Sequence, residues 1–240
     1  MKTKYTYDIT VFDNITTPEQ AYWIGFIWSD GYVMKRERKI GIEYAMKLTL
    51  SKQDFEHLEK FVKFMKSNLP IQEYERRKSS FENSQGEARV LINSSEFGKK
   101  LYYDFGIVPF RNDPKKTIER IPNELYKYFI MGILDADGSF TFYETVDKKS
   151  LRKKANLSFQ SVEKLIWFIR DYLYDNNFIQ TKQKYYKRHE GRDGDSFAYR
   201  LSGVPQVTAI LDYMYSDEEI LKFCLKRKHE KYKDSKNFLK

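Results

Sequence analysis

Two nine-residue stretches decide the fold of this chain: WIGFIWSDG at residues 23–31 and IMGILDADG at residues 130–138. In both stretches apolar residues fill the same slots, and a glycine, a small residue, an aspartate and a final glycine follow with the same spacing. Short similar segments recur downstream at nearly the same offset, at residues 48–50 and 157–159 and again at 71–72 and 179–180. Near-constant offsets along the chain indicate an internal duplication.

Each half is predicted to have the order α-β-β-α-β-β-α, because apolar residues recur at helical spacing in some segments and alternate in others. In the first half we expect helices at 18–29, 52–68 and 94–105, and strands at 32–38, 43–50, 71–78 and 87–92. In the second half we expect helices at 123–136, 162–176 and 204–213, and strands at 139–145, 154–159, 181–188 and 196–201. A last segment, 217–240, is predicted to start as a helix and then fray. The expected divisions are a first repeat at 1–110, a linker at 111–121, and a second repeat with a basic tail at 122–240.

The composition excludes several classes of protein. Lys and Arg total 43 against 34 Asp and Glu, which gives a net charge of +9, and 17% of the residues are aromatic. Basic and aromatic residues together are typical of nucleic-acid binding. The single cysteine, Cys224, excludes an intrachain disulfide and a cysteine-based zinc site. We expect an intracellular protein with no membrane partner, in the cytoplasm, nucleoid or organelle matrix, because the chain has no long apolar run and no apolar leader.

Small residues predict how the two repeated helices pack. Gly25 lies four residues before Ser29, and Gly132 lies four residues before Ala136, so each pair shares one helix face. Small residues on one face allow two helix backbones to approach closely. The ends of the two helices then meet, and Asp30 and Asp137 lie side by side. Paired carboxylates need a cation nearby, and oxygen ligands suit Mg²⁺.

Asp135 is a competing acidic candidate in the second stretch. Its counterpart in the first half is Trp28, so only the Asp30/Asp137 position is acidic in both halves. Residues two apart also point to different sides of a helix. We therefore interpret Asp135 as a packing or capping residue.

The two stretches resemble the paired signature of the LAGLIDADG homing endonucleases in their single-chain, two-motif form. The second copy is close to the family pattern, whereas the first departs from it at Trp23, Trp28 and Ser29 but keeps its glycines and final aspartate. The resemblance spans about residues 17–228. It implies an α+β fold of two pseudo-symmetric α-β-β-α-β-β-α repeats, with curved antiparallel sheets forming a DNA-binding saddle and the motif helices packed at the centre.

The resemblance also implies roles for individual residues. The final aspartates, Asp30 and Asp137, would bind the metal ions with help from the backbone carbonyls of the residues before them, Ser29 and Ala136. A basic residue lies after the last helix of each repeat in the family, and here we expect it to be Lys116 and Lys228. Gln160 resembles a polar residue that positions water, and its register partner in the first half, Ser51, is shorter.

The strands are expected to carry the DNA-binding surface. Every second residue of a strand faces the same way, and one face of these strands combines basic residues with tyrosines. Strands can enter the major groove, where Arg and Lys read guanine and Asn or Gln reads adenine. The residues expected to contact DNA are Tyr32, Met34, Arg36, Arg38, Lys47, Tyr74, Arg76, Lys78, Lys154, Asn156, Lys182, Lys184, Tyr186 and Arg188.

The resemblance implies a monomeric, intron-encoded or free-standing nuclease that hydrolyses both strands of a long asymmetric site in double-stranded DNA and leaves 3′ overhangs. The expected cofactor is Mg²⁺, with Mn²⁺ or Ca²⁺ able to substitute for binding. Two alternatives stay open. The same scaffold could serve an intron RNA maturase or a DNA-binding regulator that does not cut, and intron RNA is then a further partner. A basic structural protein is the other alternative, and metal-dependent nicking of DNA would exclude it.

Overall fold

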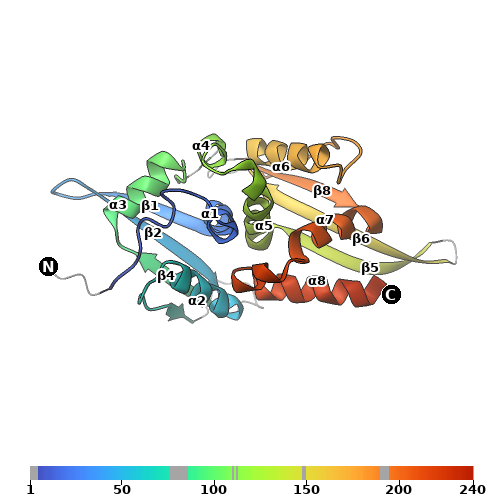
Figure 1. Cartoon of the computed structure of the whole chain (residues 1–240), viewed down its shortest axis with the longest axis horizontal. Helices are drawn as coiled ribbons and strands as arrows, with labels where there is room; N and C mark the ends of the chain where they lie inside the picture. Colours follow the sequence, from blue (N-terminus) through green and yellow to red (C-terminus); the bar gives the residue numbers. More distant parts are fainter. Residues whose placement is uncertain are drawn as a thin grey trace.

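The computed structural model describes residues 5–75, 86–109, 111, 113–147, 150–189 and 195–239. It consists of two similar halves placed side by side, joined by a short connection that contains helix α4 (Lys115–Ile118) (Figure 1). Each half has a four-stranded antiparallel sheet with helices on one face, which is an α+β architecture.

The first half begins with the first repeated stretch. Its elements are α1 (Pro18–Asp30), β1 (Gly31–Glu37), β2 (Ile42–Ser51), a 3₁₀ turn (Lys52–Asp54), α2 (Phe55–Phe64), β3 (Gln72–Tyr74), β4 (Glu87–Ile92) and α3 (Ser95–Lys99), which continues as one π-helical turn (Lys100–Asp104).

The second half repeats this order and adds a helix at its end. Its elements are a 3₁₀ turn (Asn123–Leu125), α5 (Tyr126–Asp137), β5 (Ser139–Asp147), β6 (Ser150–Ser161), α6 (Glu163–Asp175), β7 (Tyr186–His189), β8 (Ser196–Ser202), α7 (Val204–Tyr215), a 3₁₀ turn (Glu218–Lys222) and α8 (Lys226–Leu239).

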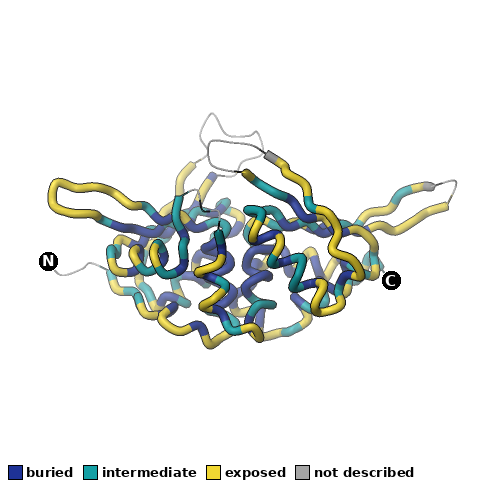
Figure 2. The backbone as a smooth tube through the Cα atoms, turned by 90° about the horizontal axis from the view of Figure 1, so that it is seen from above, coloured by how far each residue is buried: buried dark blue, intermediate teal, exposed yellow. Residues whose placement is uncertain are grey.

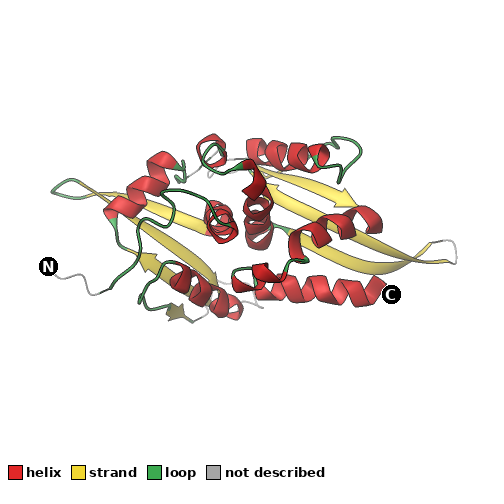
Figure 3. Ribbon diagram, viewed as in Figure 1, coloured by secondary structure: helices red, strands yellow, loops and turns green. Residues whose placement is uncertain are grey.

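The two sheets have the same topology, which confirms the predicted pair of repeats. The strand orders are β1-β2-β4-β3 and β5-β6-β8-β7, and all neighbouring strands are antiparallel. The helices lie against one face of both sheets (Figure 3). Seen from above, the helices form the body of the molecule, and the β1–β2 and β5–β6 hairpins spread outward to either side with largely exposed ends (Figure 2).

Helices α1 and α5 cross at the centre of the molecule. Thr17 caps α1 by accepting a hydrogen bond from the backbone N–H of Gln20, and Pro18 takes the first helical position. A Cβ added at Gly25 would lie 2.2 Å from the carbonyl oxygen of Phe129, and one added at Gly132 would lie 2.2 Å from that of Tyr22. The structure therefore places both predicted glycines where the two backbones touch, and no larger residue fits there.

Several predicted boundaries are wrong, and tertiary contacts explain the differences. The helix predicted at 52–68 ends at Phe64, because the chain turns at Lys66, which has a positive φ of 47°. The last segment does not fray. Helix α8 continues to Leu239 because Tyr232 is buried and donates a hydrogen bond to Asp212 (2.9 Å). Strand β7 begins only at Tyr186, five residues later than predicted.

Among the residues that the structure describes, no helix is both long enough and apolar enough to cross a membrane.

Candidate active site

Asp30 and Asp137 are the last residues of α1 and α5, and the crossing of these helices brings them together. The backbone N–H of the next residue ends each helix, with Gly31 bonded to the carbonyl of Ile27 and Gly138 to that of Leu134. Helix C-termini carry partial negative charge, so two carboxylates and two negative helix ends converge on one spot.

The charge of one acid acts on the other. Burial and the neighbouring charge of Asp137 raise the pKa of Asp30 to about 7. Burial also raises the pKa of Asp137, while Arg111, Lys228 and the hydroxyl of Ser29 act in the opposite direction. Asp30 is half-buried and Asp137 is exposed, so solvent reaches the site. This combination suits groups that must meet a large substrate at a surface.

Lys228 is the basic residue that the second half brings to this spot. It lies in the first turn of α8 and is only 5% exposed. Its Nζ donates to the carbonyl oxygens of Leu134 and Gly138, at 2.5 Å each, on either side of the end of α5. Burial lowers the pKa of its ammonium to about 8, while the charges of Asp135, Asp137 and Asp30 oppose the shift. The structure thus places Lys228 where the sequence predicted it.

In the first half Arg111, and not the predicted Lys116, is the basic residue that contacts the end of α1. Arg111 donates to the carbonyl oxygens of Ser29 (2.6 Å) and Gly31 (3.2 Å), and the charges of Asp137 and Asp30 favour its protonated form. The Nζ of Lys116 donates instead to the carbonyl of Tyr103 (2.9 Å), because α4 turns this residue toward the end of the preceding π-helical turn. Arg111 could have been found as the first basic residue after the end of the repeat.

The remaining predicted site residues are Gln160, Ser29 and Ala136. Gln160 lies near the end of β6, where its Oε1 accepts a hydrogen bond from Arg188 and its Nε2 donates to Ser196 (3.1 Å). The carbonyl oxygen of Ser29 is engaged by Arg111, so a metal ion would have to share it or replace the guanidinium. Ala136 is half-buried in the last turn of α5.

Asp135 is buried within the protein, as the sequence indicated. Its carboxylate accepts hydrogen bonds from Tyr22 (2.7 Å), from Tyr215 and from the backbone N–H of Leu225 (2.8 Å). These contacts join α5 to α1, to α7 and to the chain just before α8. Asp135 therefore belongs to the packing between the helices, not to the open site.

The donor set at Asp30 and Asp137 fits hard divalent cations whose coordination a substrate completes. In the described part of the chain no group of three or more His, Cys, Asp or Glu side chains gathers in one place, so this is not a closed metal cage. Mg²⁺ typically uses one or two carboxylates and leaves other positions to phosphate oxygens and water. Burial and the charge of Asp137 both disfavour the ionised form of Asp30 and raise its pKa, and a bound cation would favour that form.

Most of the predicted DNA-binding residues lie on the exposed face of the sheets, opposite the helices. On β1 and β2, Tyr32 and Lys47 are directly paired, and the Lys47 Nζ lies 5.4 Å from the centre of the Tyr32 ring. On β6, Asn156 donates to Tyr143 (3.3 Å) and accepts from Ser202 (2.7 Å). The remaining members with at least partly exposed side chains are Met34, Arg36, Arg38, Tyr74, Lys154, Lys184, Tyr186 and Arg188.

Three of these residues differ from the prediction. Lys182 forms an ion pair with Asp171 of α6 (3.0 Å), on the side of the helices, and Lys184 lies in the loop before β7 and not in a strand. Arg38 follows the end of β1 and is paired with Glu43 (2.7 Å). The prediction continued the alternation of a strand past the end of β1 and before the start of β7. Arg76 and Lys78 lie outside the described residues.

Two further arginines share the open faces, and the sequence analysis missed them. Arg89 of β4 lies with its guanidinium carbon 4.4 Å from the centre of the Tyr74 ring, and that of Arg200 of β8 lies 5.0 Å from the Tyr186 ring. Both positions alternate with buried neighbours along their strands, which is the signal that would have identified them.

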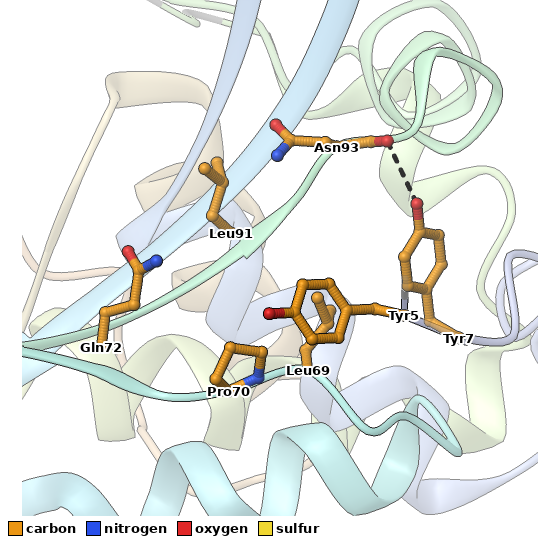
Figure 4. A pocket seen from close by; sticks show the side chains of 7 residues that line it. All are labelled: Tyr5, Tyr7, Leu69, Pro70, Gln72, Leu91 and Asn93. Carbon is orange, nitrogen blue, oxygen red and sulfur yellow. Dashed lines mark hydrogen bonds between the residues drawn. The ribbon is translucent and has the colours of Figure 1, made fainter. Parts of the chain in front are cut away.

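A separate cavity of 220 Å³ lies at the outer edge of the first sheet (Figure 4). Its lining residues are Tyr5, Tyr7, Leu69, Pro70, Gln72, Leu91 and Asn93, and Tyr7 donates a hydrogen bond to the carbonyl of Asn93 (3.1 Å). None of the paired acids or cations described above lines it, so it is not part of the candidate active site.

Comparison with known proteins finds similarity in structure alone. No protein-family profile matches the sequence, and no curated protein matches it. Among solved structures, the chain is similar to the LAGLIDADG meganuclease I-CpaMI bound to uncleaved DNA, with a TM-score of 0.54 and 14% identity over 93% of this chain and 90% of that one. It is also similar to the I-SmaMI LAGLIDADG homing endonuclease bound to cleaved DNA, with a TM-score of 0.54 and 16% identity over 85% and 84% of the two chains. For I-LtrWI bound to target DNA the TM-score is 0.53 and the identity 10% over 88% and 84%.

These neighbours align over most of their own length as well as most of this chain, so the likeness includes both repeats and the central helix pair. The chain therefore has the fold of the single-chain LAGLIDADG endonucleases, with one motif helix from each repeat at its centre.

Proposed function

We propose that this protein is a homing endonuclease that cuts both strands of a long, asymmetric DNA site by metal-dependent hydrolysis, leaving 3′ overhangs. The observation that carries the proposal is the convergence of two carboxylates and two cations at the centre of the open face. Asp30 and Asp137 provide oxygen ligands, and Arg111 and Lys228 provide fixed positive charge beside them.

The two acids would hold the divalent cations, with Mg²⁺ the expected one. Such ions, when bound, stabilise the charge that develops on a phosphate and make water a better nucleophile at neutral pH. The chain itself contributes preorganised charge. Arg111 and Lys228 are anchored by backbone carbonyls, so they need little rearrangement to stabilise a phosphate that gains negative charge. Gln160, whose side chain is held by Arg188 and Ser196, would orient water beside the ions.

The open faces of the sheets would hold the DNA on either side of the acids. Tyrosines and basic residues lie beside each other there and form cation–π pairs, such as Arg200 with Tyr186 and Arg89 with Tyr74. These contacts would hold the side chains in place before DNA binds. Each sheet would read one half of the target. Since the two repeats carry different residues on these faces, the target would be asymmetric.

Cleavage of both strands follows from the closeness of the two acids. Asp30 and Asp137 end two helices that cross with backbone contact, so two reaction centres would lie side by side. Two adjacent centres can reach phosphates on opposite strands only across a narrow minor groove, and cuts made there are offset toward 3′ overhangs. Bending of the DNA would bring the two phosphates closer, at an energetic cost that depends on sequence. The protein would act as a monomer, because both motifs are in one chain.

The test is cleavage of a randomised DNA library in Mg²⁺, run beside the double variant Asp30→Asn/Asp137→Asn. We expect wild-type protein to cut a single long site on both strands and the variant to bind the same site without cutting. Salt-sensitive binding with no cutting by either protein would overturn the proposal. It would favour the regulator or the intron RNA maturase, and intron RNA would then be the ligand to test.

A further inference from the structure

The residue two positions before each paired acid differs between the repeats: it is Trp28 in the first and Asp135 in the second. Both are buried, at 1% and 0% exposure, so neither can touch DNA. Each is nevertheless linked to the cation of its own repeat. Trp28 contacts Arg111 through its ring, and Asp135 accepts a hydrogen bond from the segment just before Lys228.

In the second repeat, Asp135 anchors the chain segment that carries Lys228. The backbone N–H of Leu225 donates to the Asp135 carboxylate (2.8 Å), and α8 begins at the next residue. The N–H of Lys228 in turn donates to the carbonyl of Leu225 (3.0 Å), so the first turn of α8 is built on the anchored residue. Two tyrosine hydroxyls satisfy the rest of the carboxylate.

In the first repeat, Trp28 provides a flat surface for Arg111. The guanidinium carbon lies 5.7 Å from the centre of the indole ring, within the range of a cation–π contact. The same guanidinium donates to the carbonyls of Ser29 and Gly31, so it is held between a ring and two backbone oxygens. An arginine suits this setting because its planar group stacks and forms several hydrogen bonds at once.

We propose that Asp135 and Trp28 are positioning residues, each acting through the cation of its own repeat, so that loss of either slows the cleavage of one DNA strand more than the other. This proposal rests on the proposed nuclease function. The position two residues before each paired acid would then support the cleavage of one DNA strand in the first repeat and of the other DNA strand in the second. A residue that matters only for folding would affect both strands equally.

The first experiment is strand-resolved single-turnover cleavage of the selected target, with a different label on each strand. Lys228→Gln and Arg111→Gln identify which strand depends on which cation. We expect Asp135→Ala, which removes the acceptor of the Leu225 N–H, to slow the Lys228-dependent strand about tenfold and the other less than twofold, and Asp135→Asn, which keeps an oxygen for that hydrogen bond, to slow it less. Trp28→Phe should slow the Arg111-dependent strand in the same selective way, with DNA affinity unchanged in all three variants.

A matched control is Asp212→Asn. Asp212 accepts a hydrogen bond from the Tyr232 hydroxyl (2.9 Å), so it also holds α8, but by a residue one turn beyond Lys228. We expect this variant to leave the ratio of the two strand rates unchanged. Equal slowing of both strands by Asp135→Ala or Trp28→Phe, or no slowing by these variants, would overturn the proposal.

The second experiment needs neither metal nor DNA. Amide hydrogen exchange is measured on the metal-free protein for wild type and Asp135→Ala, with Asp135→Asn as the variant that keeps the hydrogen bond. We expect exchange at residues 225–229 to be at least tenfold faster in Asp135→Ala and near wild type in Asp135→Asn. Unchanged exchange in Asp135→Ala would overturn the anchoring role. If wild-type protein cuts no DNA, the nuclease proposal fails while this measurement still decides whether Asp135 positions Lys228.

Discussion

The substitution Asp30→Asn should stabilise the metal-free protein at alkaline pH while abolishing DNA cleavage. Burial and the charge of Asp137 raise the pKa of Asp30 from 3.8 to about 7. The unfolded chain therefore releases this proton more readily than the folded chain. The protonated carboxyl of Asp30 therefore favours the folded protein. This contribution to the free energy of unfolding is full below pH 3.8 and is lost as the pH rises through about 7.

The magnitude can be bounded from the same shift. Each pKa unit corresponds to about 1.4 kcal/mol, so the ionised carboxylate costs at most about 4 kcal/mol above pH 7. Solvent reaches one side of the site and screens the charges, so we expect about 1–2 kcal/mol. For a chain of this length that is about 3–6 °C in Tm. Asparagine keeps the shape of the side chain and removes the charge.

The assay is thermal denaturation in a chelator at pH 5 and pH 8, followed by titration with Ca²⁺ at pH 8. Asp30→Asn should have the higher Tm at pH 8, and the difference should shrink toward pH 5. Under the proposed function Ca²⁺ should raise the Tm of wild type more than that of the variant, since two carboxylates would bind the cation in wild type and only one in the variant. A variant that is less stable at pH 8, or a difference that does not depend on pH, would refute the reasoning.

Other predictions test the helix crossing, the choice of cation, the buried thiol and the DNA surface. Gly132→Ala should cost about 3 kcal/mol in urea unfolding, because the new Cβ would lie 2.2 Å from a backbone oxygen of α1, and a loss below about 1 kcal/mol would show that the helices can separate. Arg111→Gln should slow single-turnover cleavage tenfold or more and Lys116→Ala less than twofold, and the reverse ranking would restore the sequence-based choice. Burial raises the pKa of Cys224 to about 12, so thiol reagents should label it at pH 8 only at the rate of unfolding, and fast labelling of folded protein would contradict this. Binding to the selected DNA site should weaken by about a thousandfold between about 50 and 200 mM salt, and a flat salt dependence would argue against phosphate contacts.

The paired acids and the helix crossing could be predicted because they depend on local spacing. Gly25 and Gly132 mark the helix faces that touch, and the acids follow five residues later in both stretches. The cation of the second half could also be predicted, since Lys228 lies in a short basic run close to its helix. Arg111 was missed because its position depends on how the connection between the halves folds back over α1.

The strand faces show the same limit. Alternation identified Tyr32 and Lys47 correctly, because the hairpin of β1 and β2 is regular in this part. It failed at Lys182, because β7 is only four residues long and the preceding chain lies against α6. Period-two patterns hold only where a strand exists, and the ends of strands are decided by contacts with the rest of the protein.

The sequence by itself determined the duplication, the α+β repeats, the crossing of the motif helices and the two converging aspartates. These features follow from periodicity and from small residues at fixed spacing, which act over one or two helical turns. The tertiary structure alone decided that Arg111 is the cation of the first half, and that Trp28 and Asp135 each hold the cation of their own repeat. Those contacts join residues about 80–90 positions apart, and such closeness depends on the path of the whole chain, which no local pattern records.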